Sequence, residues 1–269
     1  MIKKGLITLA TVLAAACAMA QDYTPLAPLR LGNDLLNLPT QQVLPRGMWE
    51  VRFTHRFAEP INEGDEDSLW GLDGSADIGI GLAWAPWRDL QFSVIRSDVQ
   101  DNWEAAIKYA LLKQAPSFPV SISARVGADI RTEDAIDQRT TEFAQLILSR
   151  QVNHRLELFA IPTYARHANS FDDAFNVPVG LAWMLKDTLA LVVEIVPENG
   201  DLPDTVESDT AWTIGIKSTV GGHYFDVMIS SSRATHVGQY VGSEFLPGVG
   251  VDSSDLHLGF NIVRRFGGR

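Results

Sequence analysis

Apolar and charged side chains alternate strictly along residues 47–57, GMWEVRFTHRF. One parity is apolar (Trp49, Val51, Phe53 and Phe57), and the other is polar or charged (Glu50, Arg52, Thr54 and Arg56). Because successive side chains of a β-strand point to opposite faces, this stretch predicts a strand with one apolar face and one charged face. Such a strand fits a soluble sheet, and it fits an outer-membrane barrel equally well. The two classes differ in how often the pattern recurs and in where the long connections lie.

The alternation recurs often enough to predict about twelve strands. Their residue ranges are 48–57, 75–85, 89–97, 103–113, 118–131, 141–151, 155–165, 175–184, 188–196, 211–219, 223–231 and 255–266. Three of them are less regular than the others. The Ala/Leu-rich segment 103–113 would also suit a helix, segment 141–151 has no clear parity, and Pro162 inside segment 155–165 indicates a bulge.

Long and short connections alternate between these strands. The longer ones are residues 58–74, 132–140, 166–174, 197–210 and 232–254, and the tight ones are residues 86–88, 114–117, 152–154, 185–187 and 220–222. An outer-membrane barrel has short turns at its periplasmic end and long loops outside, whereas a soluble sandwich has no reason to put its long loops at one end. The pattern predicts an all-β fold, a closed antiparallel up-and-down transmembrane β-barrel with both termini in the periplasm. A secreted or surface-attached soluble β-protein that binds a partner is the alternative.

Aromatic residues near the predicted strand ends support the membrane interpretation, because interfacial girdles are a feature of these barrels. They are Trp49, Trp84, Trp87, Trp103, Tyr164, Trp183 and Trp212. The last strand, GFNIVRRF, ends at Phe266, three residues before the end of the sequence. If it pairs with the first strand, no unpaired edge faces lipid. We expect a monomer that contacts outer-membrane lipid and is recognised by the barrel-assembly machinery through the strand ending at Phe266.

Composition agrees with this class. The chain has 269 residues, 46% of them hydrophobic, and after residue 20 no stretch is apolar over the roughly 20 residues that a spanning helix needs. The net charge of −11 argues against nucleic acid as a partner.

The N-terminus reads as a secretory signal peptide covering residues 1–20. Lys3 and Lys4 precede an apolar core at residues 6–16, and an A-x-A cleavage site ends at Ala20, so the mature chain is expected to begin at Gln21. Cys17 would be the lipidated residue of a lipoprotein, but the large aliphatic residue usual three positions upstream is missing. After cleavage no cysteine remains, which excludes a disulfide. Residues 21–46 contain four prolines and are expected to form an irregular periplasmic lead-in at the mouth of a barrel domain covering residues 47–269.

Several stretches resemble a bacterial family, the β-barrel family catalogued as domain of unknown function 5777. They are LPRGMWEVRFTHRF from Leu44, LWGLDGSADIGIGLAWAPWRDLQFSVIRSD, WEAAIKYALLKQ, and the tail GQYVG followed by LHLGFNIVRRF. The resemblance covers most of the mature chain and implies a membrane β-barrel. It implies no activity, and it assigns no functional residues.

The predicted lumen carries both signs of charge. Nine charged residues have the inward parity, and we take them as lumen-lining candidates: Glu50, Arg52, Arg56, Lys108, Arg125, Asp129, Glu194, Lys217 and Asp226. Opposed charges could set a transverse field in a narrow passive channel for small polar solutes. Alternatively, they could pair across the lumen and plug a structural barrel, because an unpaired buried charge is unfavourable. A barrel of about twelve strands lies between small filled barrels and wide channels.

No catalytic, cofactor or metal site is expected. The histidines at positions 55, 154, 167, 223, 236 and 257 are scattered without the short spacing of metal ligands. Some twelve-stranded barrels are lipases with a Ser/His/Asn constellation, but Ser149 and His154 lie at a strand end and its turn without an evident third group. The loops 58–74 and 197–210 are acidic, and without calcium-loop spacing they read as solvated surface.

Overall fold

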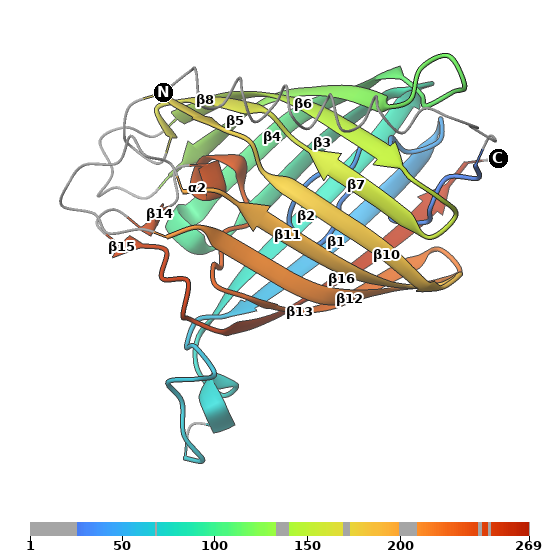
Figure 1. Cartoon of the computed structure of the whole chain (residues 1–269). Coiled ribbons are helices and arrows are strands. Elements are labelled where there is room, and N and C mark those ends of the chain that lie inside the picture. The colour runs from blue at the N-terminus through green and yellow to red at the C-terminus, as the bar shows by residue number, and fades with distance from the viewer. Residues whose placement is uncertain are drawn as a thin grey trace.

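A computed structural model describes residues 26–67, 69–132, 140–168, 173–198, 209–241, 244–246 and 249–268. It shows a closed antiparallel β-barrel (Figure 1). The expected signal peptide, its cleavage after Ala20 and Cys17 lie outside these residues, as do residues 199–208 of the second acidic loop. Among the described residues, no helix has the length and hydropathy needed to cross a membrane.

The barrel wall consists of fourteen strand segments that form one sheet. They are β1 (Met48–Phe57), β2 (Ala76–Trp87), β3 (Leu90–Ser97), β4 (Asn102–Leu112), β5 (Ser121–Arg131), β6 (Thr140–Gln151), β7 (Leu156–Ala160), β8 (Thr163–Arg166), β9 (Ala174–Asn176), β10 (Val179–Lys186), β11 (Leu189–Val196), β12 (Ala211–Val220), β13 (His223–Ser230) and β16 (His257–Gly267). Two pairs, β7/β8 and β9/β10, are each one interrupted strand, so the fourteen segments make twelve barrel strands. The short strands β14 (Glu244–Leu246) and β15 (Val249–Gly250) form a separate hairpin.

The sheet closes because the first and last strands pair. β1 lies between β2 and β16, with Trp49 opposite both Trp84 and Phe266, and the pairing of β5 with β6 completes the ring. Tight turns gather at one end of the barrel and long loops at the other, as Figure 1 shows. We call these the short-turn end and the long-loop end. The expected fold class and strand number are therefore confirmed.

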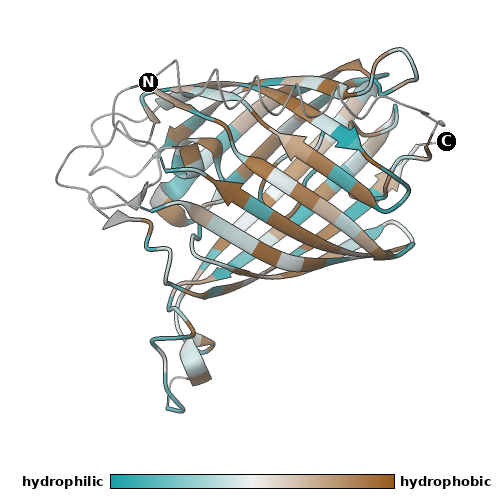
Figure 2. Ribbon diagram, viewed as in Figure 1, coloured by the Kyte–Doolittle hydropathy of each residue, from teal (hydrophilic) through white to brown (hydrophobic). Residues whose placement is uncertain are grey.

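Hydrophobic and hydrophilic residues are mixed along the strands of the barrel wall, as Figure 2 shows. Exposed side chains such as Ile80, Val126 and Val227 follow one parity of each strand, while the other parity is buried and largely polar. Aromatic side chains mark the two ends of this band. Trp49, Trp84, Trp87, Tyr109, Trp183 and Phe266 lie toward the short-turn end, and Trp103, Tyr164, Phe175 and Trp212 toward the long-loop end. An exposed apolar band between aromatic girdles is the surface that meets lipid, and a soluble protein would bury it.

Three irregular segments differ from simple alternation for physical reasons. Pro162 ends the ladder between β7 and β8, and Pro178 ends it between β9 and β10, because proline has no N–H to donate. The two breaks face each other, with the Ile161 N–H donating to the Pro178 carbonyl at 2.8 Å. In β6 the inward positions include Phe143 and Ile147, and these buried apolar residues explain why its parity was unclear from sequence. β4 is a strand rather than a helix.

Two segments lie inside the barrel. Residues 26–46, which the sequence placed at the barrel mouth as a periplasmic lead-in, run into the interior, where Leu31, Leu35 and Leu36 are fully buried. We call them the plug segment. Residues 231–241, which belong to a connection expected outside, fold inward from the long-loop end and include the short helix α2 (Val237–Val241; Figure 1). We call them the inward loop.

Candidate functional site

The barrel interior is the candidate site, and Glu194 is the main anchor of the plug segment within it. This residue follows Val192 on the inward face of β11 and is buried. Its carboxylate accepts the backbone N–H groups of Leu36, Asn37 and Leu38 at 2.8, 2.9 and 2.9 Å. Three donors converge on one anion, so the carboxylate compensates for the loss of water and fixes the turn of the plug segment.

Basic side chains from the opposite wall hold the carbonyl side of the plug segment. Arg52 on β1 forms an ion pair with Asp34 at 2.9 Å and donates to the Leu36 carbonyl. Lys108 on β4 donates to two plug carbonyls at 3.2 Å. Burial tends to raise the pKa of Asp34, but the positive charge of Arg52 lowers it below its usual value. Asp34 therefore stays charged at neutral pH.

Apolar residues on one side of the interior also hold the plug segment. Leu31, Leu35, Leu36 and Leu38 are at most 1% exposed and pack in one cluster with inward residues of several strands. Burying a leucine stabilises by about 1.5–3 kcal/mol, so these four add a substantial apolar contribution to that of the polar contacts. The interior thus has an apolar side as well as a charged side.

The inward loop is held by two carboxylates on neighbouring strands. Glu104 on β4 accepts the N–H of Val237 at 3.0 Å, and Asp129 on β5 accepts the N–H of Gly238. The glycine allows the close approach, because a Cβ at position 238 would overlap the Asp129 carboxylate. Burial lowers the pKa of His236, which precedes these two residues in the loop, to about 4, so its ring is neutral at neutral pH.

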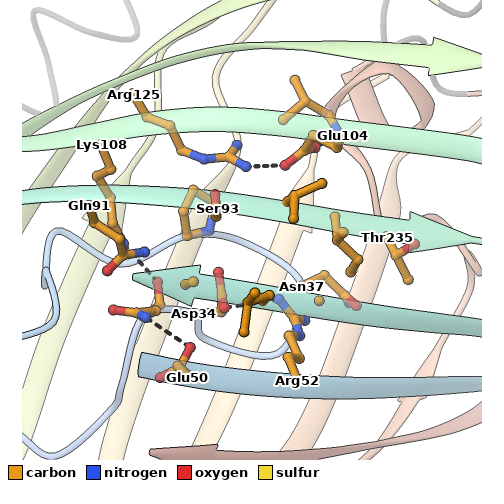
Figure 3. Close-up of a pocket in the computed structure, with 18 of the residues that line it drawn as sticks. Asp34, Asn37, Glu50, Arg52, Gln91, Ser93, Glu104, Lys108, Arg125 and Thr235 are labelled. Atoms are coloured by element: carbon orange, nitrogen blue, oxygen red, sulfur yellow. Dashed lines mark hydrogen bonds and ion pairs between the residues drawn. The ribbon is translucent and has the colours of Figure 1, made fainter. Parts of the chain in front are cut away.

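Small cavities remain between the plug segment and the inward loop. One of about 70 Å³ is bordered by Asp34 and Arg52 on one side and by Thr235 and Tyr240 on the other. Figure 3 shows Arg52, Lys108 and Arg125 around it, with the carboxylates of Asp34, Glu50 and Glu104 nearby. A second cavity of about 240 Å³ lies at the short-turn end, between the plug segment and the turn residues. The inner cavity has room for only a few water molecules, so the plug segment and the inward loop fill this part of the lumen.

The nine candidate residues all lie on inward faces of the wall, and most contact the plug segment. Glu50 binds Asn33, Arg56 binds Asn37, and Arg52, Lys108 and Glu194 make the contacts described above. Arg125 forms an ion pair with Glu104, and Asp129 binds the inward loop. Lys217 and Asp226 pair with each other across β12 and β13 at 2.7 Å. These charges are thus paired mainly with the plug segment, which lies inside the barrel, and not with charges on the opposite side of the wall.

Sequence reasoning missed several residues of the interior. Glu104, Arg131 and Arg265 share the inward parity of their strands, so the alternation alone could have found them. Asn33 and Asn37 carry no such signal, because the plug segment has no periodic structure. His236 belongs to a loop that looked external, and only its place in the fold brings it beside Glu104 and Asp129.

The structure separates the two residues considered for a lipase site. Ser149 is buried on the inward face of β6, whereas His154 is exposed in the turn that follows β6. Asp209 of the second acidic loop accepts hydrogen bonds from Ser253. The acidic residues 63–67 of the first are exposed or half-buried, as solvated surface should be.

The apolar outer face, the aromatic girdles and the closed sheet define a membrane barrel. A comparison with protein families leads to the same class of protein. Residues 31–266 match the model of the membrane-bound β-barrel domain DUF5777. The chain belongs to this family. The match begins within the plug segment, at a leucine that is fully buried in the lumen, and ends at Phe266 of β16. A search of the curated proteins gave no match.

Solved structures with a similar fold are outer-membrane proteins. The KdgM porin aligns with a TM-score of 0.50 and 8% identity, over 82% of this chain and 99% of the porin. The NanC porin gives 0.49 and 9%, over 82% and 100%. Outer membrane phospholipase A from Escherichia coli gives 0.45 and 9%, over 83% and 94%. At 8% identity the alignment with the KdgM porin shows a shared β-barrel fold and nothing further.

Proposed function

We propose that this family member is a narrow channel for small polar solutes whose lumen is closed by the plug segment and opens when that segment leaves. The main observation behind the proposal is how the plug segment is held. Its contacts with the wall, including three N–H groups on Glu194 and the ion pair of Asp34 with Arg52, are non-covalent. The wall beneath them is lined with charges of both signs, which would face water once the segment has moved.

A permanently closed structural barrel is the second candidate. The four buried leucines of the plug segment favour it, because their release would expose a large apolar area to water. The two functions differ in one measurable property, the conductance of the barrel with and without its plug segment.

Single-channel recording in a planar bilayer tests the proposal with three proteins: the mature chain, a variant lacking residues 26–46, and a crosslinked variant. For the last, Asn37→Cys and Thr213→Cys are joined by a short thiol-reactive bridge, because the two native side chains are 3.2 Å apart. The mature chain should be closed with rare openings, the deletion variant should show stable conductance steps, and the bridge should abolish the rare openings.

A folded deletion variant without conductance would overturn the channel proposal and leave the structural barrel. The heat-dependent gel mobility of membrane barrels and their β-type circular dichroism report whether each variant has folded. The crosslinked protein is a second control, because reduction of a cleavable bridge restores the unlocked state in the same molecule. If openings persist with the bridge intact, the plug segment is not the gate.

A further inference from the structure

The strongest unexplained feature of the interior lies where the inward loop meets the wall. Glu104 on β4 and Asp129 on β5 are direct cross-strand partners, and His236 of the inward loop lies against them. One ligand-capable atom from each residue falls within 4.8 Å of the other two. All three side chains are buried, His236 and Asp129 completely. Two carboxylates directly opposite each other in a buried ladder repel each other, and a cation between or beside them lowers that energy.

Two arginines act on this pair of carboxylates, but one carboxylate oxygen keeps no hydrogen-bond partner among the described residues. The positive charge of Arg131, two residues after Asp129 on β5, acts on the Asp129 carboxylate. Arg125 forms an ion pair with Glu104, whose second oxygen accepts the Val237 N–H. Asp129 uses one oxygen for the Gly238 N–H, and its Oδ1 has no hydrogen-bond partner among the described residues.

His236 is the second observation that indicates a ligand. Both of its ring nitrogens lack a hydrogen-bond partner among the described residues, although the side chain is fully buried. A buried polar atom without a partner is unfavourable by about 1–3 kcal/mol, and native structures rarely leave both nitrogens of one ring in this state. The Nδ1 atom lies 3.9 Å from the unpartnered Oδ1 of Asp129, too far for a hydrogen bond. A third atom bonded to both groups could bridge this separation.

We propose that Glu104, Asp129 and His236 bind a divalent transition-metal ion of the zinc class. One imidazole nitrogen with two carboxylate oxygens suits zinc, whereas magnesium and calcium prefer oxygen ligands alone. Zinc bonds of about 2.0–2.2 Å place neighbouring ligands roughly 3.4 Å apart, so small side-chain movements would close the site. The ion would bind the unpartnered Oδ1 of Asp129 and satisfy one nitrogen of His236. Oxygens already bound by N–H groups keep a further lone pair for the metal.

The bound ion would tie the inward loop to the wall. Thr235, Val237 and Tyr240 of that loop border the inner cavity, so the metal would hold one side of the closed lumen in place. This part of the inference rests on the proposed channel function, whereas metal binding itself does not.

Isothermal titration of metal-stripped, detergent-solubilised mature protein with zinc chloride tests the binding. We expect one zinc per chain, and at least 100-fold weaker binding in both His236→Gln and Asp129→Asn. His257→Gln is the matched control, because this second buried histidine contacts Asp255 and the Phe57 carbonyl instead, and its binding should be unchanged. Cobalt should give visible absorption bands in the native protein that disappear in His236→Gln, and magnesium should not compete.

Absence of stoichiometric zinc binding by the native protein would overturn the proposal, and so would undiminished binding by both ligand variants. If one variant fails to fold, the other still decides the question. Conductance of the variant lacking residues 26–46 separates this inference from the channel proposal. Zinc binding without conductance would refute the channel and keep the site, whereas conductance without zinc binding would refute the site and keep the channel. If both stand, zinc should reduce the conductance of that variant but not that of its His236→Gln derivative.

Discussion

The plug segment and the inward loop both fill the lumen, yet the wall meets them differently. The turn at residues 36–38 is well matched, because three N–H groups converge on Glu194 and leucines pack beside it. The inward loop also places N–H groups on two carboxylates, but His236 and Asp129 keep atoms that have no hydrogen-bond partner in the described part of the chain. The comparison shows that a charged lumen can be completed by a segment of the same chain, and that incomplete pairing indicates where a further ligand belongs.

The substitution Glu194→Ala should have the largest effect on this comparison. It leaves three buried N–H groups without an acceptor, which is unfavourable by at least about 3 kcal/mol in total. Amide hydrogen exchange measured by mass spectrometry should then be at least 100-fold faster in residues 35–38, with β1 unchanged. Glu142→Ala, which removes an exposed carboxylate remote from the plug segment, is the control. If the amides of the plug segment exchange as slowly in Glu194→Ala as in the native protein, the buried leucines alone hold the segment.

Because His236 of the inward loop is buried, the free energy of unfolding of the protein should depend on pH. Burial lowers the pKa of His236 to about 4, whereas an unfolded histidine has a pKa of about 6.5. The unfolded state therefore binds the additional proton first, and the contribution of His236 falls as the pH drops from 6.5 toward 4, by up to about 3 kcal/mol. Urea unfolding of metal-free protein in lipid vesicles at pH 7 and pH 4.5 measures this loss.

His236→Gln is the comparison for the pH experiment. It should lose less stability than the native protein over the same interval, and the difference between the two is the histidine contribution. Equal losses would show that other groups dominate the acid sensitivity of the barrel. Saturating zinc should raise the stability of the native protein at pH 7 and have little effect on the variant.

Gly180→Ala should have the smallest effect and probes how closely the wall fits the plug segment. A Cβ at position 180 would overlap the end of the Leu35 side chain, whereas the next nearest atom, the Cβ of Phe159, is 3.6 Å away. Because leucine can adjust its rotamer, we expect weakening of about 1 kcal/mol, seen as roughly fivefold faster exchange in residues 35–39. The double variant with Leu35→Ala should show less than the sum of the two single effects. Strict additivity would mean that the two residues do not touch in solution.

The wall of this barrel was largely readable from the amino-acid sequence. Strand parity separated lipid-facing residues such as Val51 and Ile80 from inward residues such as Glu50 and Lys108, because a strand repeats every two residues. Where the parity was unclear, in β6, the cause is a tertiary contact, since Phe143 and Ile147 face an apolar part of the interior.

The contents of the lumen were decided by the tertiary structure alone. The plug segment is bound largely through backbone N–H and carbonyl groups, which every sequence carries. No residue pattern therefore predicts that this segment binds in the lumen. His236 meets Glu104 and Asp129 across more than one hundred positions of chain, and nothing local marks that approach. Periodic local structure is encoded in neighbouring residues, whereas a segment without periodicity is placed by whichever distant groups satisfy its hydrogen bonds and cover its leucines.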